Sequence, residues 1–526
     1  MTQRYDVIIV GGGHNGLVAA GYLARARLSV LVLERRPLVG GACVTEEIAP
    51  GFRCSTTSYV CSLLRPEVIR ELALEDHGFE VVPCAASFIP FADGAHLLLG
   101  LGAGEDARQI GRFSPRDAEA YPRFNAALHR LADFLRPMLS ATPPDLPAPG
   151  LGGLLELLRM GRRFRALSRA DRGLLVKVMT MSIADLLDEW FESPRLKTML
   201  AAAGTVGLYG SPRTPGTAFV LLHQGLGEVA GEKGAWGFVR GGMGALAEAM
   251  AASARAGGAT VRTDASVARI SVADGVATGV VLESGEEIAA RVVASNADPK
   301  RTFLGLLEPS CLPPDFRRGI ESFRCRGNSA KVNLALSELP RFTSLPGDGP
   351  QLRGLIQVAG EDPEYLEAAF RDYAEGRPSR RPYLEIAIPS TVDDSLCPPG
   401  RHVMSISIKF VPLHLREGSW EGRRRELGDL AIDTLAGYAP NLGGAVLHRQ
   451  VLTPADFEQV YGLTGGNIMQ GTMSLSSLSF MRPVPGYADY RTPIRGLYLC
   501  GAATHPGGGV MGACGYNAAR EILRDG

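Results

Sequence analysis

Hydrophobic residues near the start of the chain follow a strand, turn and helix pattern. Asp6 is followed by a continuous apolar run with β-branched side chains at residues 7–10. Residues 11–16 are rich in glycine, and residues 17–24 are mostly apolar. A second apolar run begins at residue 29 and ends at Glu34. Short apolar runs on either side of a helical segment are typical of buried parallel strands, so the pattern predicts a β-α-β unit here.

The turn of this unit has the spacing of a dinucleotide-binding fingerprint. Gly11, Gly13 and Gly16 stand in the order G-x-G-x-x-G, and Glu34 follows 18 residues after Gly16. In this arrangement the glycines let the backbone approach a pyrophosphate, and the acid accepts hydrogen bonds from a ribose. The order of strand, glycines, helix, strand and acid makes a ligand-free glycine turn a poor explanation.

A family resemblance is carried by both ends of the chain. The residues after Glu34 include a second glycine pair, Gly40 and Gly41, and residues 496–509 read GLYLCGAATHPGGG. With the opening GGGHNGLVAA and the central KGAWGFVRGGMG of residues 233–244, these motifs resemble phytoene dehydrogenase-like flavoproteins of the amine oxidase and glutathione reductase type. The resemblance implies an FAD cofactor, and it implies that Val267 contacts the adenine through its backbone. The residues expected to bind FAD are Gly11, Gly13, His14, Asn15, Gly16, Glu34, Arg35, Gly41, Ala42, Val267, Gly501, His505, Gly512 and Ala513.

The remaining pattern predicts an α/β fold with two domains. A Rossmann-like FAD-binding domain would be built from three discontinuous segments, residues 1–75, 231–300 and 455–526. An α+β substrate domain with a mixed sheet and a helical cap would comprise residues 76–230 and 301–454. Extended runs at residues 330–336 and 402–409 support the mixed sheet, and helical periodicity dominates between residue 100 and residue 230.

Composition narrows the function classes further. The 55 Lys and Arg residues balance the 55 Asp and Glu residues, which argues against nucleic acid as a partner. Nine scattered cysteines without a C-x-x-C pair predict neither a disulfide framework nor a metal site. The N-terminus lacks the pattern of a secretory signal, so we expect a cytoplasmic protein.

Candidate polar residues for the chemistry are few. His505 lies in the glycine-rich C-terminal loop expected beside the flavin, and His223 precedes the central segment; either could handle a proton, and either could be structural. Trp236 and Tyr461 are candidate walls of a substrate pocket, with core packing as the alternative. Asn467 and Gln470 are also placed there, where close relatives are expected to carry an acid and a histidine. This departure puts acid–base chemistry at the two positions in doubt.

One basic segment stands apart from the rest. Residues 154–169 combine leucines at helical spacing with five arginines and are interrupted by Gly161. The segment fits either a peripheral membrane contact or a cap helix with a solvated basic face.

The leading functional hypothesis is an FAD-dependent oxidoreductase, a dehydrogenase, desaturase or oxidase. It would remove hydride from a C–H bond of an apolar small molecule, with the flavin reoxidised by oxygen or a quinone. A nicotinamide acceptor is not expected, because no second G-x-G-x-x-G is led directly by an apolar strand. The alternatives are a carotenoid desaturase or isomerase, and a flavin-free binding protein like the Rab GDP-dissociation inhibitors. The sequence leaves the substrate and the oligomeric state open.

Overall fold

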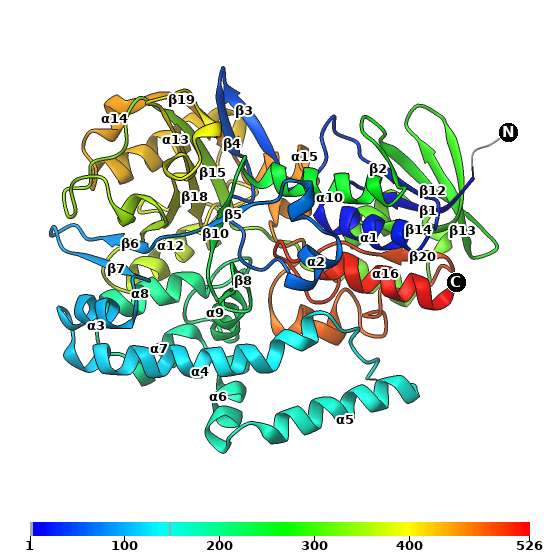
Figure 1. Cartoon of the computed structure of the whole chain (residues 1–526), viewed down its shortest axis with the longest axis horizontal. Coiled ribbons are helices and arrows are strands. Elements are labelled where there is room, and N and C mark those ends of the chain that lie inside the picture. The colour runs from blue at the N-terminus through cyan, green and yellow to red at the C-terminus, as the bar shows by residue number, and fades with distance from the viewer. Residues whose placement is uncertain (1–3, 147–148) are drawn as a thin grey trace.

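Two seven-stranded β-sheets organise the chain and lie on opposite sides of the molecule (Figure 1). The structure is a computed structural model that describes residues 4–146 and 149–526. The strands of the first sheet come from three separated parts of the chain, β1 (Arg4–Val10), β2 (Val30–Leu33), β11 (Thr260–Arg262), β12 (Val267–Ala273), β13 (Val276–Leu282), β14 (Glu287–Ser295) and β20 (Leu497–Leu499). Their order is β11-β2-β1-β14-β13-β12, and β20 pairs with β14.

The central strands of this sheet are parallel and buried on both faces. β11, β2, β1, β14 and β20 run parallel, whereas β13 is antiparallel to its neighbours β12 and β14. Val7 and Ile9 pack under the helices α1 (His14–Arg25), α10 (Met243–Ala256) and α16 (Ala513–Asp525), while Ile8 packs against the opposite layer. Burial on both faces explains the unbroken apolar run seen in the sequence.

The second sheet is mixed. Its strands are β6 (Ser87–Pro90), β7 (His96–Leu99), β15 (Ser329–Leu336), β16 (Leu355–Val358), β17 (Leu384–Ala387), β18 (His402–Lys409) and β19 (Val446–Leu452). The order is β19-β15-β18-β17-β16-β6-β7, in which β16 and β6 pair in parallel and the other pairs are antiparallel. One face is apolar and packs with helix α13 (Trp420–Ala436).

Helices cover the lower part of the molecule in Figure 1 and form the predicted cap. They are α3 (Ala103–Gly111), α4 (Pro115–Leu139), α5 (Leu151–Ala166), α6 (Arg169–Thr180), α7 (Ile183–Trp190), α8 (Pro194–Ala203) and α9 (Thr217–Gln224). The other α-helices are α2 (Pro66–Glu71), α11 (Pro314–Ser322), α12 (Glu364–Ala374), α14 (Leu442–Ala445) and α15 (Pro454–Gln459). The two-stranded ribbons pair β3 (Thr45–Ala49) with β4 (Phe52–Ser55), β5 (Val81–Pro83) with β10 (Gly237–Val239), and β8 (Glu228–Val229) with β9 (Glu232–Lys233). In the part of the chain that the structure describes, no helix has the length and apolarity needed to cross a bilayer.

Helix α5 corrects one detail of the sequence interpretation. The helix runs through Gly161 without a break and ends at Ala166, so Arg169 belongs to α6. A glycine in a helix costs only about 1 kcal/mol relative to alanine, and the leucines and arginines around it favour the helix. None of the α5 residues is buried, and Figure 1 shows the helix at the edge of the molecule.

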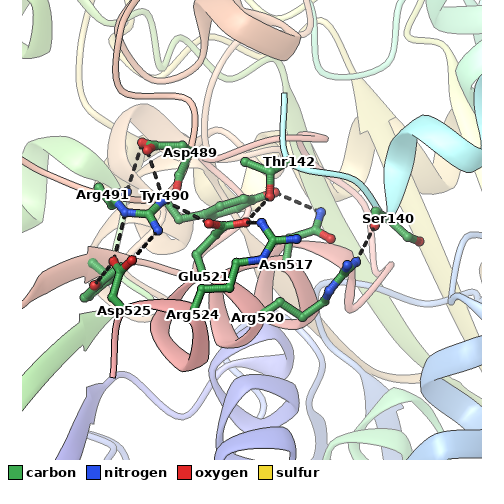
Figure 2. Close-up of polar contacts among 11 residues, drawn as sticks. Ser140, Thr142, Asp489, Tyr490, Arg491, Asn517, Arg520, Glu521, Arg524 and Asp525 are labelled. Atoms are coloured by element: carbon green, nitrogen blue, oxygen red, sulfur yellow. Dashed lines mark hydrogen bonds and ion pairs between the residues drawn. The ribbon is translucent and has the colours of Figure 1, made fainter. Parts of the chain in front are cut away.

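A polar network ties the C-terminal helix α16 to the end of the cap helix α4 (Figure 2). Glu521 is buried and accepts hydrogen bonds from Thr142 and Arg524, at 2.5 Å each, and it forms an ion pair with Arg491 at 2.9 Å. Asn517 donates to the carbonyl of Leu139 at 3.0 Å. Charged hydrogen bonds in a buried setting are among the stronger polar contacts, so this network fixes the cap against the first sheet.

Candidate functional site

A cavity of about 550 Å³ is lined by residues of both sheets. Val10, Leu33 and Val267 contribute from the first sheet, and Glu385 and Lys409 contribute from the second. The cavity lies at the carboxyl ends of β1 and β2, which is where ligands bind in open parallel sheets. The cavity therefore joins the predicted nucleotide site to the predicted substrate domain.

The glycine turn after β1 has the close packing that the fingerprint predicts. Gly11 has a positive φ of 98°, and its amide donates to the carbonyl of Leu33 at 2.8 Å. A Cβ at Gly16 would lie 2.4 Å from the carbonyl oxygen of Gly11, so only glycine fits there. The second glycine pair lies against this turn, because Gly40 donates to the carbonyl of Gly12 at 2.8 Å.

Glu34 closes this end of the cavity. One of its carboxylate oxygens accepts from the amide of Gly12 at 2.8 Å, and the other accepts from the amide of Arg36 at 2.9 Å. The side chain is buried and lines the cavity. The carboxylate is therefore held in place by backbone donors at the position where a ribose would be recognised.

Three arginines line the same end of the cavity. Arg35 donates to the carbonyl of Val460 at 2.7 Å, and Arg301 donates to the carbonyl of Glu458 at 2.8 Å. Arg36 pairs with Glu46 at 2.6 Å, and its guanidinium lies 4.8 Å from the centre of the Tyr461 ring. Guanidinium groups at the wall favour a ligand that carries phosphates.

Several buried polar atoms of the cavity-lining residues have no hydrogen-bond partner among the described residues. They are His14 Nε2, Asn15 Oδ1, Arg36 Nη1, Gln224 Nε2, Arg301 Nε and Gln470 Oε1. A buried polar atom without a partner is costly, and a ligand with many polar atoms would relieve that cost. With the glycine turn and Glu34, these atoms fit a dinucleotide.

The predicted site residues divide into two groups by position. The residues that line the cavity are Gly11, Gly13, His14, Asn15, Glu34, Arg35, Gly41, Ala42, Val267, Trp236, Tyr461 and Gln470. The predicted residues outside its lining are Gly16, Gly501, Gly512, Ala513, His505, His223 and Asn467. Gly512 precedes the first turn of α16, as predicted, but the neighbouring Gly509 and Val510 reach the cavity instead.

The two candidate histidines make backbone contacts instead of lining the cavity. His505 Nε2 lies 2.8 Å from the carbonyl oxygen of Met138, and His223 Nε2 lies 3.2 Å from that of Gly508. Burial lowers the pKa of each imidazole to about 4, so both are neutral at neutral pH. In this geometry His505 connects the C-terminal loop to the end of α4.

The side chain of Asn467 also forms hydrogen bonds with the backbone instead of lining the cavity. Its amide nitrogen donates to the carbonyl of Arg326 at 3.0 Å, and its oxygen accepts from the amide of Met469 at 2.8 Å. Gln470, by contrast, faces the cavity with an oxygen that has no partner among the described residues. Of the two neutral amides, only Gln470 is placed to meet a ligand.

The sequence interpretation missed the polar residues that the second sheet contributes. Glu385 and Lys409 line the cavity, and Tyr59 lies beside them. The sequence does hint at this polar surface, because polar and apolar side chains alternate in residues 329–333 and 405–409. A strand with one polar and one apolar face is commonly exposed on its polar face, so this alternation does not reveal a buried site.

Comparisons with known proteins agree with the architecture and place the chain in a flavin-containing class of oxidoreductase. The chain belongs to the flavin-containing amine oxidoreductase family, whose pattern matches residues 16–523. It is 44% identical over 547 residues to the rat pyridine nucleotide-disulfide oxidoreductase domain-containing protein 2, covering 100% of this chain and 94% of the relative. It is 28% identical to one of the subunits of limonene dehydrogenase from Castellaniella defragrans, covering 100% of this chain and 95% of that relative.

Among solved structures, putrescine oxidase bound to putrescine superposes with a TM-score of 0.61 at 16% identity, covering 100% of this chain and 99% of that one. The resemblance inferred from the sequence motifs is thereby confirmed, as is the α/β fold with its mixed sheet. The protein is an enzyme of the oxidoreductase class.

Proposed function

We propose that this protein is an FAD-dependent oxidoreductase that removes hydride from a C–H bond of a small molecule. The observation that carries the proposal is the continuous cavity that runs from the glycine turn and Glu34 to the polar residues of the second sheet. A nucleotide bound at the first end would place its reactive ring toward the second end. Membership of a flavin-containing family supports this arrangement.

In this proposal the first sheet, with α1, α10 and α16, forms the cofactor-binding unit, and the second sheet with the cap helices forms the substrate unit. Gly11 to Gly16 would bind the pyrophosphate, Glu34 the ribose, and the backbone near Val267 the adenine. FAD, when bound, supplies the acceptor for the hydride. The apolar lining residues Val60, Val206 and Trp236 would disfavour water beside the bound cofactor in this proposal.

The cofactor itself gives the first prediction. Acid precipitation of the purified protein is expected to release FAD into solution, because the proposal holds the cofactor by the glycine turn and Glu34 without a covalent bond. Chromatography of the supernatant against FAD and FMN standards checks this. Recovery of FMN, of no flavin, or of flavin attached to a peptide would contradict the proposal.

The electron acceptor gives the second prediction. We propose that oxygen or a quinone reoxidises the flavin. The chain has two G-x-G-x-x-G spacings, and the proposal assigns Gly11 to Gly16 to FAD. The second, Gly507, Gly509 and Gly512, does not directly follow a strand, because β20 ends at Leu499. Anaerobic stopped-flow mixing with NADH or NADPH is expected to leave the oxidised flavin absorption unchanged over the time of a turnover. Rapid bleaching by either nucleotide would show a nicotinamide-dependent cycle instead.

We also propose that helix α5 contacts an anionic lipid surface. Leu151, Leu154, Leu155 and Leu158 are exposed, with Leu151 at 84% and Leu158 at 65% of their full accessible area. Arginines 159, 162, 163 and 165 follow on the same helix, against a single acid, Glu156. Exposed leucines and arginines on one surface helix are typical of helices that lie in the headgroup region of a bilayer.

The third prediction tests this contact by sedimentation with vesicles. The protein is expected to sediment with phosphatidylcholine vesicles that contain phosphatidylglycerol, and less with phosphatidylcholine alone, because each arginine near an anionic surface contributes about 1 kcal/mol. The double variant Leu154→Asp, Leu158→Asp should lower binding at least about tenfold. Leu447→Asp, at an exposed leucine of β19, is the matched control. Equal binding of wild type and double variant would remove the membrane role.

Two alternatives have distinct signatures. A carotenoid desaturase or isomerase would convert a long polyene, which product analysis with such a substrate would show. A flavin-free binding protein like the Rab GDP-dissociation inhibitors would yield no flavin in the acid-release experiment. The dinucleotide geometry of the glycine turn and Glu34 favours the flavoprotein.

A further inference from the structure

One face of the second sheet is polar although it is buried. Ser329, Lys331 and Asn333 alternate along β15, and Ser405, Ser407 and Lys409 alternate along β18. Lys331 is in register with Ser407, and Ser407 is in register with Glu385 of β17. Side chains at paired positions lie on the same face of a sheet, so these residues form one polar surface across three strands. We call these seven residues the polar face.

Several polar groups of this face have hydrogen-bond partners, either on the face itself or on the neighbouring tyrosines. Glu385 accepts hydrogen bonds from the hydroxyls of Tyr59 and Tyr383, the latter at 3.1 Å. Lys331 donates to the hydroxyl of Ser405, and its ammonium lies 3.8 Å from the centre of the Tyr59 ring. Such a network is stable when every member has a partner.

Lys409 has no such partner among the described residues. Its side chain is 3% exposed and lines the cavity, and none of the described residues gives its ammonium a hydrogen bond or an ion pair. Burial lowers the pKa of Lys409, while the carboxylate of Glu385 opposes that shift. Glu385 lies farther away than an ion-pair distance and already accepts from two phenols. A buried ammonium with free donors facing a cavity calls for an acceptor, best an anionic one, in the cavity.

Much of the cavity lining is apolar, although Ser62, Gln224 and Gln470 add polar groups to it. The apolar lining residues include Val60, Leu63, Val206, Trp236, Ile468 and Met469. A ligand that suits both features has an apolar body and one acidic group. The ammonium of an amine ligand would be repelled by that of Lys409, which disfavours an amine at this position.

We propose that Lys409 binds a carboxylate of the substrate and that the enzyme oxidises a C–H bond in the apolar body of a carboxylic acid. A carboxylate fits because its single negative charge offsets one ammonium and its oxygens accept charge-assisted hydrogen bonds. The assignment rests on the proposed function, since it places the substrate in the cavity beside the cofactor. It differs from the amine named for the structurally similar putrescine oxidase.

The test uses octanoate and octanamide as probes, which have the same chain length and differ in charge. Isothermal titration calorimetry of the FAD-loaded protein is expected to show octanoate binding about 10- to 100-fold more tightly than octanamide, the range given by a charge-assisted hydrogen bond. Lys409→Met should remove this preference and leave octanamide affinity within about threefold. Lys331→Met removes the other buried lysine of the polar face, which does not line the cavity, and it should retain most of the preference.

Three results would overturn the assignment. Equal affinity for the two probes, or the absence of octanoate binding, would show that the cavity does not select an acid. Equal loss of the preference in Lys331→Met and Lys409→Met would assign it to the polar face as a whole. A Lys409→Met protein that keeps the preference but loses FAD would place Lys409 at the cofactor. Calorimetry reads binding without turnover, so a protein that prefers octanoate but carries no FAD would contradict only the proposed function.

Discussion

Gly16→Ala is expected to raise the dissociation constant of FAD at least about 100-fold, although the substitution adds only one methyl group. The added Cβ would lie 2.4 Å from the carbonyl oxygen of Gly11 and 3.2 Å from side-chain atoms of Asn296 and Ile9. The carbonyl belongs to the turn proposed to hold the pyrophosphate, so relief of the clash must distort that turn. Flavin content after purification and titration of apoprotein with FAD measure the effect.

Gly21→Ala is the matched control for this variant. Gly21 lies in the same helix, and there the added Cβ would meet Leu72 Cδ2 at 3.0 Å, a side-chain atom that can move. Both variants replace glycine by alanine within the same helix, so both gain the same helix propensity. Gly21→Ala should keep its flavin. Full flavin content in Gly16→Ala would mean that FAD does not depend on this turn.

Glu34→Ala is expected to weaken FAD binding by about 2 to 4 kcal/mol, because hydrogen bonds to a charged group contribute about 1.5 to 3 kcal/mol each. The substitution removes the proposed ribose acceptor, and it also removes the acceptor that fixes the amide of Gly12. Glu34→Gln keeps the size and one acceptor and should fall between wild type and alanine. Equilibrium titration of apoprotein gives the dissociation constants.

Glu283→Ala serves as the control for the loss of a carboxylate. Glu283 also lines the cavity, but its side chain is exposed. Screening by water makes an exposed carboxylate contribute little, so this variant should change FAD affinity by less than about threefold. An unchanged dissociation constant in Glu34→Ala would assign the ribose to another residue.

The local part of the site could be predicted from the sequence. The glycines after β1, the acid after β2 and the second glycine pair are close in the chain, and their spacing alone determines the strand, turn and helix that bring them together. The apolar runs likewise predicted the central strands β1 and β2, because strands covered on both faces are apolar throughout. The three separated segments of that sheet were predicted with the help of the family resemblance, because apolar runs alone do not show which segments pair.

The cavity residues of the second sheet could not be predicted from the sequence, because their positions depend on the tertiary structure. Alternation predicts that residues 402–409 are extended, but it does not say which face meets a cavity or which strand lies beside Glu385. Glu385 pairs with Ser407, 22 residues later, and Ser407 pairs with Lys331, 76 residues earlier, and only the packed chain decides these pairings. The same holds for His505 and His223, which the sequence placed near the chemistry and the structure places on backbone carbonyls. The sequence by itself determined the class of cofactor site, since its contacts are local in the chain. The tertiary structure decided which buried polar groups face the cavity, since those groups contact residues far away in the chain.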